Sequence, residues 1–160
     1  DNDKRKSAYF IVTKNGVIGT GKLKQTSATV ADGGSNIIVL RYADVLLMLA
    51  ECYAEKDDVS KSNEYLNLIK KRAGIEEVSI GDATLIKEEI ALERRKELVN
   101  EGHRWFDLIR TGKAVEVMNA YFTRTPGYTG ITISELNYVQ PIPQGQIDTD
   151  SATKQNEGYN

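Results

Sequence analysis

The chain has 160 residues, and 21 lysines and arginines stand against 23 aspartates and glutamates, a net charge of −2. A protein that binds nucleic acid through its phosphates normally has a basic excess, so this balance argues against that class. The single cysteine, Cys52, excludes an internal disulfide framework and a cysteine-based zinc site. The longest apolar run, at 45–50, is far shorter than the ~20 residues that span a bilayer.

Residues 1–36 are expected to form an extended lead-in. The β-branched and aromatic segment 8–13 favours a strand, and Asn15-Gly16 is a strong hairpin-turn signal. The small, polar residues 27–35 predict a loop. The chain begins at Asp1 without an initiator methionine, which suggests a piece of a longer protein.

Residues 37–120 are expected to be helical. Apolar residues recur at helical spacing in 41–56, and a second helix is predicted over 60–73 with Gly74 as its stop. Two such helices joined by a short turn form an antiparallel hairpin, the unit of tetratricopeptide-like stacks. Asp82 can cap a third helix that runs to about Asn100.

Two shorter helices are predicted at 103–110 and 113–120, and 121–160 is expected to be a loop-rich closing segment with a short strand at 131–133. The predicted fold is therefore mainly α. It has tetratricopeptide-like helix pairs, irregular loops and a short β-hairpin near the N-terminus. We expect one domain over 1–160.

Six basic and six acidic residues are concentrated between Lys87 and Arg110. Glu93, Glu97 and Glu101 lie at i, i+4 and i+8 on one helix face, where like charges repel. Such carboxylates can bind a hard cation or act as an acid/base pair, or arginines can neutralise them. Neutralisation by arginines is favoured, because Arg94, Arg104 and Arg110 are close by in the sequence and no Asp/Asn-rich loop supplies calcium ligands. No metal is predicted.

Arg94 lies on an otherwise apolar stripe with Ile86, Ile90 and Leu98. A guanidinium on such a face is costly unless a carboxylate pairs with it, so we expect a buried pair with Glu51, Asp107 or Glu101. The predicted structural ion network comprises Glu51, Glu93, Arg94, Glu97, Glu101, Arg104, Asp107 and Arg110.

Nucleophilic catalysis has little support. It would have to use His103, the only histidine, and no G-x-S-x-G motif is present. His103 is expected to pack at the start of a helix, and Cys52 to be a small core residue. The glycines show no nucleotide-binding pattern, so no cofactor is predicted.

Three aromatic residues, Tyr121, Phe122 and Tyr128, flank Pro126-Gly127 in a predicted loop. Loop aromatics can stack on the apolar C–H face of a sugar ring, or they can simply cover the helices. These three are the candidate ligand-binding residues.

Several blocks resemble the SusD/RagB family in its C-terminal half. They occur in the family's order and extend over about 37–160, with a lead-in at Asp3-Lys4-Arg5. The blocks are Leu40-Arg41-Tyr42 to Glu51, Leu66-Asn67, Lys71-Arg72-Ala73-Gly74, Glu93 to Leu98, Glu101 to Gly112, Pro141-Ile142-Pro143 and Gln155-Asn156 with Gly158-Tyr159.

The resemblance implies a non-catalytic lipoprotein on the outer membrane of Bacteroidota-type bacteria. Such proteins capture a polysaccharide, oligosaccharide or other nutrient and deliver it to a SusC-like TonB-dependent transporter. The family's lipidated cysteine and N-terminal half are absent from this sequence, so membrane attachment would occur only through an anchor outside this chain. Family ligand sites lie on variable loops, so no binding residue is transferred by motif.

Two other functions remain as alternatives. One is a helical scaffold that binds protein or peptide in a groove. The other is a glycoside hydrolase, which needs two carboxyl groups about 5–10 Å apart across a cleft. Glutamates stacked along one helix and neutralised by arginines do not provide that arrangement.

Overall fold

A computed structural model describes residues 2–12, 14–22 and 36–159. It is mainly helical, with a two-stranded antiparallel hairpin near the N-terminus, as the sequence predicts. The chain divides into two compact units, Asp1–Arg104 and Trp105–Asn160. The loop expected at 27–35 lies outside the described residues.

The lead-in contains helix α1 (Arg5–Tyr9), strand β1 (Phe10–Val12) and strand β2 (Ile18–Thr20). Ile11 lies opposite Gly19 in the hairpin, and Gly16 in the turn has a φ of 78°. The strand begins at Phe10, two residues after its predicted start at residue 8. The Asp3 carboxylate accepts from the backbone N–H of Arg5 at the start of α1, and this helix extends through Ala8 to Tyr9.

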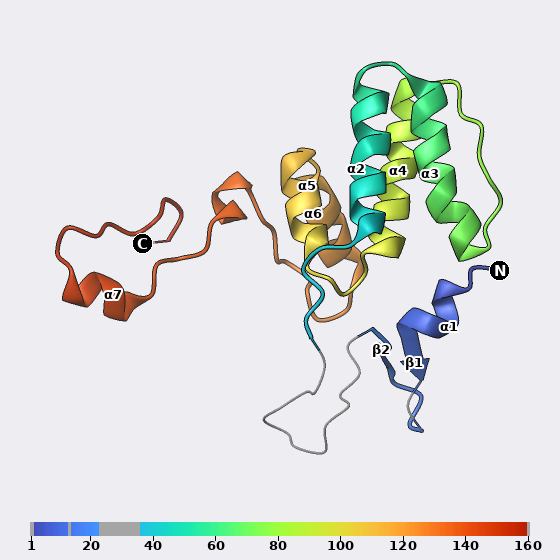
Figure 1. The fold of residues 1–160 in the computed structure, drawn as a ribbon. Coiled ribbons are helices and arrows are strands. Elements are labelled where there is room, and N and C mark those ends of the chain that lie inside the picture. Colours follow the sequence, from blue (N-terminus) through green and yellow to red (C-terminus); the bar gives the residue numbers. More distant parts are fainter. Residues whose placement is uncertain (1, 13, 23–35, 160) are drawn as a thin grey trace. The chain divides into compact units, whose positions relative to one another are not determined.

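Three helices form the core of the first unit (Figure 1): α2 (Tyr42–Glu55), α3 (Val59–Ala73) and α4 (Ala83–Glu97). The helices α2 and α3 make the expected antiparallel hairpin, and α4 packs against both. Their apolar faces meet in one cluster of buried residues: Ala43, Leu46, Leu47, Ala50, Ala54, Leu66, Ile69, Ile86 and Ile90.

The helix ends follow the sequence signals closely. The Asp82 carboxylate accepts from the backbone N–H groups of Thr84 and Leu85, which confirms the predicted cap of α4. Gly74 ends α3 in the left-handed region with a φ of 76°. Helix α4 ends at Glu97, before the predicted Asn100, which itself has a φ of 63°.

The segment between α3 and α4 is held by two asparagine side chains. Asn67 accepts from the backbone N–H of Val78 and donates to the carbonyl of the same residue, at 2.9 and 2.8 Å. Asn63 makes the same pair of bonds with Ile80. Each amide thus satisfies backbone groups that have no strand partner, and Val78 and Ile80 pack against the core.

The second unit contains most of α5 (His103–Arg110), then α6 (Ala114–Arg124), the 3₁₀ turn η1 (Glu135–Tyr138) and α7 (Gln144–Thr149). Helix α6 extends four residues beyond its predicted end. The strand expected at 131–133 is wrong, because the side chain of Asn119 occupies both backbone groups of Ile133. No helix within the described ranges is long and apolar enough to cross a membrane.

Candidate functional site

The three stacked glutamates lie where α2 begins and α3 and α4 end. Glu93 and Glu97 are completely buried, and the side chain of Glu101 is 3% exposed. Burying three carboxylates is costly unless cations and hydrogen-bond donors surround them. The structure supplies both to Glu97 and Glu101, whereas Glu93 is bound by Arg5 through Oε1 and its buried Oε2 has no hydrogen-bond partner among the described residues. We name the set of Glu93, Glu97, Glu101, Arg5, Lys22, Arg41 and Arg72 the glutamate network.

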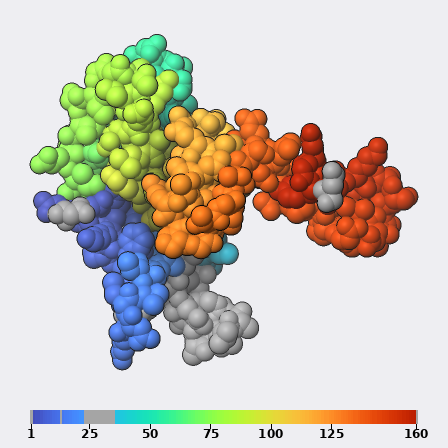
Figure 2. Space-filling view, turned by 180° about the vertical axis from the view of Figure 1, so that it is seen from behind, coloured from blue at the N-terminus to red at the C-terminus, as the bar shows by residue number. Residues whose placement is uncertain are grey.

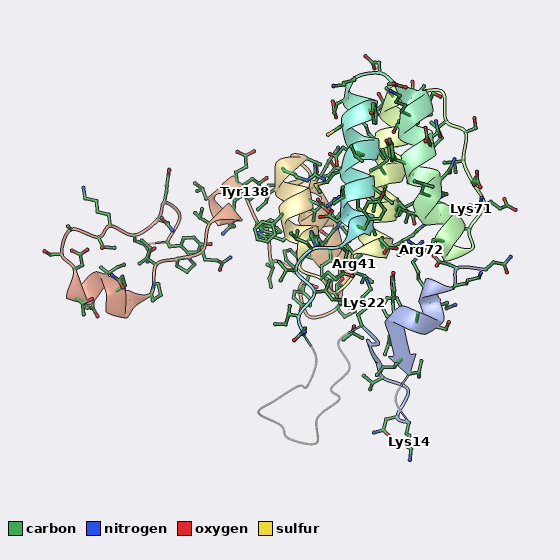
Figure 3. The ribbon with its side chains drawn as sticks, viewed as in Figure 1. Lys14, Lys22, Arg41, Lys71, Arg72 and Tyr138 are labelled. Carbon is green, nitrogen blue, oxygen red and sulfur yellow. The ribbon has the colours of Figure 1, made fainter. Side chains whose placement is uncertain are left out.

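Glu97 lies at the centre of the glutamate network. Arg5 and Arg72 donate to its Oε2, while Arg41 and the Tyr9 hydroxyl donate to its Oε1. Figure 3 shows the side chains of Arg41 and Arg72 close together at this end of the helices. One carboxylate therefore joins α1, the start of α2 and the end of α3 to α4.

Glu101 binds one further cation, Lys22, and shares Arg41 with Glu97. Lys22 donates to its Oε1 and Arg41 to its Oε2, the latter at 2.8 Å. Lys22 follows β2 and Arg41 immediately precedes α2, so this carboxylate connects the hairpin to the helices. Figure 2 shows the N-terminal segment, in blue, lying against the ends of these helices.

The electrostatics of the glutamate network favour charged carboxylates. Burial acts to raise the pKa of Glu97, but hydrogen bonds and charge from Arg72 and Arg41 outweigh it and hold that pKa below its ordinary value. Burial also acts to raise the pKa of Glu101, but hydrogen bonds and charge from Arg41 and Lys22 outweigh it, so this pKa is lowered as well. Burial lowers the pKa of Lys22, and its bond to Glu101 offsets this only in part.

The glutamate network contains four cations that the sequence did not indicate. Arg94, Arg104 and Arg110 were expected to neutralise the glutamates, and the structure adds Arg5, Lys22, Arg41 and Arg72, which contact them. The partners missed by sequence reasoning come from 25 to 92 residues away. Three of them, Arg5, Arg41 and Arg72, lie in the blocks that resemble the SusD/RagB family, and that was the available signal.

The remaining members of the predicted ion network lie elsewhere. Arg94 is buried, and its Nη1 donates to Oδ1 of Asp44 at 2.7 Å, a partner that was not among the expected ones. Arg110 pairs with Asp107 within α5. Glu51 lies half-buried on α2, and Arg104 half-buried in the first turn of α5. His103 is half-buried at the start of α5, whereas Cys52 is exposed, so its assignment to the core was wrong.

The three candidate ligand-binding aromatics form one cluster in the second unit. Phe122 and Tyr128 are stacked, with ring centroids 5.5 Å apart and planes 17° apart, and Tyr121 lies 5.8 and 5.9 Å from them. Tyr121 and Tyr128 remain 40% and 42% exposed. The expected loop placement is wrong for Tyr121 and Phe122, which lie in the last turns of α6. A helix therefore fixes two of the three rings.

The aromatic cluster (Tyr121, Phe122 and Tyr128) offers an exposed apolar surface bordered by two phenol hydroxyls. That combination suits a ligand with an apolar face and polar edges. By contrast, the carboxylates of the glutamate network are occupied by cations. In the described part of the chain, no group of three histidine, cysteine or acidic side chains is arranged to hold a metal ion.

Comparison with known proteins gives a family. The sequence model of the SusD family matches residues 1–159. The chain belongs to the SusD family. The resemblance noted in the sequence is therefore confirmed, and the match extends over almost the whole 160-residue chain.

Relatives within the SusD family are longer than this chain. A SusD-like protein from Formosa agariphila is 40% identical over 93 residues, which is 52% of this chain and 18% of that protein. A second SusD-like protein from the same bacterium is 32% identical over 131 residues, 78% of this chain and 24% of that protein. The chain thus spans about a quarter or less of the curated relatives that it matches.

A solved structure has a fold similar to that of this chain. The surface glycan-binding protein A from Bacteroides thetaiotaomicron aligns with a TM-score of 0.74 at 28% identity, over 98% of this chain and 38% of that protein. Helical and hairpin elements like those of this chain therefore occur in a solved surface glycan-binding protein.

Proposed function

We propose that the chain contributes to the non-catalytic capture of an extracellular glycan, or another nutrient, at the bacterial cell surface. The aromatic cluster is the observation that carries this proposal, because it presents rings that can stack on the C–H face of a sugar. Membership of the SusD family supports it, as does the similarity to a protein named for surface glycan binding.

Delivery to a SusC-like TonB-dependent transporter completes the proposed function. In this proposal the protein is a cell-surface lipoprotein of the outer membrane, attached only through an anchor outside this chain. Its partners are the transporter and a polysaccharide or oligosaccharide. The occupied carboxylates of the glutamate network support a binding role over acid/base catalysis, because Glu97 and Glu101 are bound by cations.

The first test is binding of the purified chain to neutral glycans, with Tyr128→Ala as the diagnostic variant. Loss of one stacking ring is expected to weaken binding by about 2- to 12-fold, which corresponds to about 0.5–1.5 kcal/mol. Tyr42→Ala is the matched control, because Tyr42 is 75% exposed and lies outside the aromatic cluster. Unchanged binding by Tyr128→Ala, or release of reducing ends from the glycan, would overturn the proposal.

A second candidate function, a helical protein-binding scaffold, is supported by one observation. The outer face of α2 exposes Tyr42, Val45 and Met48 at 75%, 42% and 43%. A helix that is apolar on its outer face as well as its inner face normally packs against another element. Binding of peptides but of no glycan by the purified chain would favour this function over the first.

A further inference from the structure

A cavity in the first unit lies between the lead-in and the second half of α4. It is open to solvent and has a volume of about 450 Å³, a size that suits a small-molecule ligand. An adjoining hollow shares Lys6 and Phe10 with it and continues along the hairpin past Val12 and Ile18. The side chains that matter for its chemistry are Lys6, Phe10, Leu92, Arg95 and Lys96.

The cavity carries three positive charges, and one of them, Lys96, interacts electrostatically with the Asp3 carboxylate in the same wall. Lys6, Arg95 and Lys96 are exposed, and none of them forms an ion pair within the described residues. Arg5 also lines the cavity, but it is bound to Asp3, Glu93 and Glu97. The chain as a whole is slightly acidic, so the excess of positive charge at the cavity is local.

The single carboxylate in the cavity wall is already in use. Oδ1 of Asp3 accepts from the backbone N–H and Nε of Arg5, and Oδ2 accepts from Nη2 at 2.8 Å. The other acidic residues near Arg95 and Lys96 in the sequence take their cations elsewhere. Glu93 and Glu97 are bound by arginines of other segments, which leaves Arg95 and Lys96 on the outer side of α4.

Apolar surface completes the cavity. Phe10 is 39% exposed and Leu92 is 43% exposed, so an aromatic ring and an aliphatic side chain lie among the cations. An inorganic anion would use only the charges, whereas a sugar ring with an acidic substituent would use both surfaces.

We propose that this cavity binds an anionic sugar residue, one that carries a carboxylate or sulfate group. Lys6, Arg95 and Lys96 would hold the acidic group, while Phe10 and Leu92 contact the ring. That the ligand is a glycan rests on the proposed function, and the cavity adds the inference that its sugar is negatively charged. The site is separate from the aromatic cluster, since it lies wholly in the unit Asp1–Arg104.

The test compares charged and neutral forms of the same polymers on the intact 160-residue chain. Dextran sulfate is set against dextran, and polygalacturonate against its methyl ester, at about 20 and about 300 mM salt. The diagnostic variant is Arg95→Gln with Lys96→Gln, since both residues are exposed. The matched control is Lys56→Gln with Lys61→Gln, which removes the same charge where α2 ends and α3 begins.

We expect the chain to bind at least one charged polymer more tightly than its neutral form, and high salt to weaken that binding. The diagnostic variant should lose about fivefold or more in affinity, while the control keeps it. Which polymer binds identifies the acidic group. Equal losses in both variants, or no preference for either charged polymer, would overturn the inference. Tyr128→Ala with a neutral glycan tests the proposed function separately.

Discussion

Arg94 and Asp44 form a buried ion pair 50 residues apart in sequence, with Nη1 of the arginine 2.7 Å from Oδ1 of the aspartate. Both residues are 5% exposed. The pair joins the first turn of α2 to the last turn of α4, inside the face that also carries Ile86 and Ile90.

Replacing Asp44 with asparagine should destabilise the first unit by about 3 kcal/mol, because the change removes one of the two charges of a buried, hydrogen-bonded ion pair. Urea unfolding followed by far-ultraviolet circular dichroism measures this loss. Glu116→Gln is the control, since Glu116 pairs with Lys113 through largely exposed side chains. Its cost should stay within about 0.5 kcal/mol. Equal costs would show that Asp44 contributes no more than a surface carboxylate.

Glu97→Gln should produce a loss of stability that depends on pH. Its pKa is lowered on folding from an ordinary value of 4.5, so the charged carboxylate stabilises the fold above that pH. The stabilisation is lost as the pH falls through the lowered pKa of the folded state. The variant should therefore be about 3 kcal/mol less stable at neutral pH, and the difference should narrow below pH 4.5.

Unfolding free energies measured from neutral to acid pH check this prediction. Glu116→Gln serves again, because the difference from the unmodified chain should remain small throughout. A Glu97→Gln deficit that stays constant into acid would mean that the charge of Glu97 is not what stabilises the folded state.

Asn67→Ala should loosen the segment between α3 and α4 at one point. The change removes both bonds to Val78 and should cost about 1–3 kcal/mol, because two backbone groups lose their partner. Hydrogen exchange should accelerate at the Val78 amide and much less at Ile80, which Asn63 still holds. Asn63→Ala should give the opposite pattern. Uniform acceleration in both variants would contradict two independent clamps.

Gly74→Ala should destabilise α3 by about 1–2 kcal/mol, because the residue has a φ of 76° and a side chain is strained there. An added Cβ would also lie 3.0 Å from the side chain of Lys4. Gly81→Ala is the matched control, with an ordinary φ and no atom within 4 Å of the added carbon. Thermal unfolding should show a lower midpoint only for Gly74→Ala.

The sequence could predict the elements whose signals are local. The Asp82 cap, the Gly74 stop and the Asn15-Gly16 turn each depend on a few adjacent residues, and the structure has all three. The end of α6 was missed, although it is also local. Pro126 disfavours helix at Thr125, and the helix continues to Arg124, just before that residue.

The partners of the buried charges were beyond local reasoning. The spacing of Glu93, Glu97 and Glu101 in the sequence showed that they need cations, although Glu101 lies beyond the end of α4. It did not show that Arg5 and Arg41 would supply them. Only folding brings α1 and the start of α2 to the end of α4. The three aromatic residues were found because they are neighbours in sequence, and their mutual packing then required only the turn at Pro126-Gly127.

Glu101 holds both Lys22 and Arg41, so the chain leaves and rejoins the helical core at the same carboxylate. Lys22 and Arg41 must both reach this carboxylate, so one side chain sets the distance between their charged groups. A change at Glu101 would therefore act on the segment after β2 and on the start of α2 together, because both are bound to this one carboxylate.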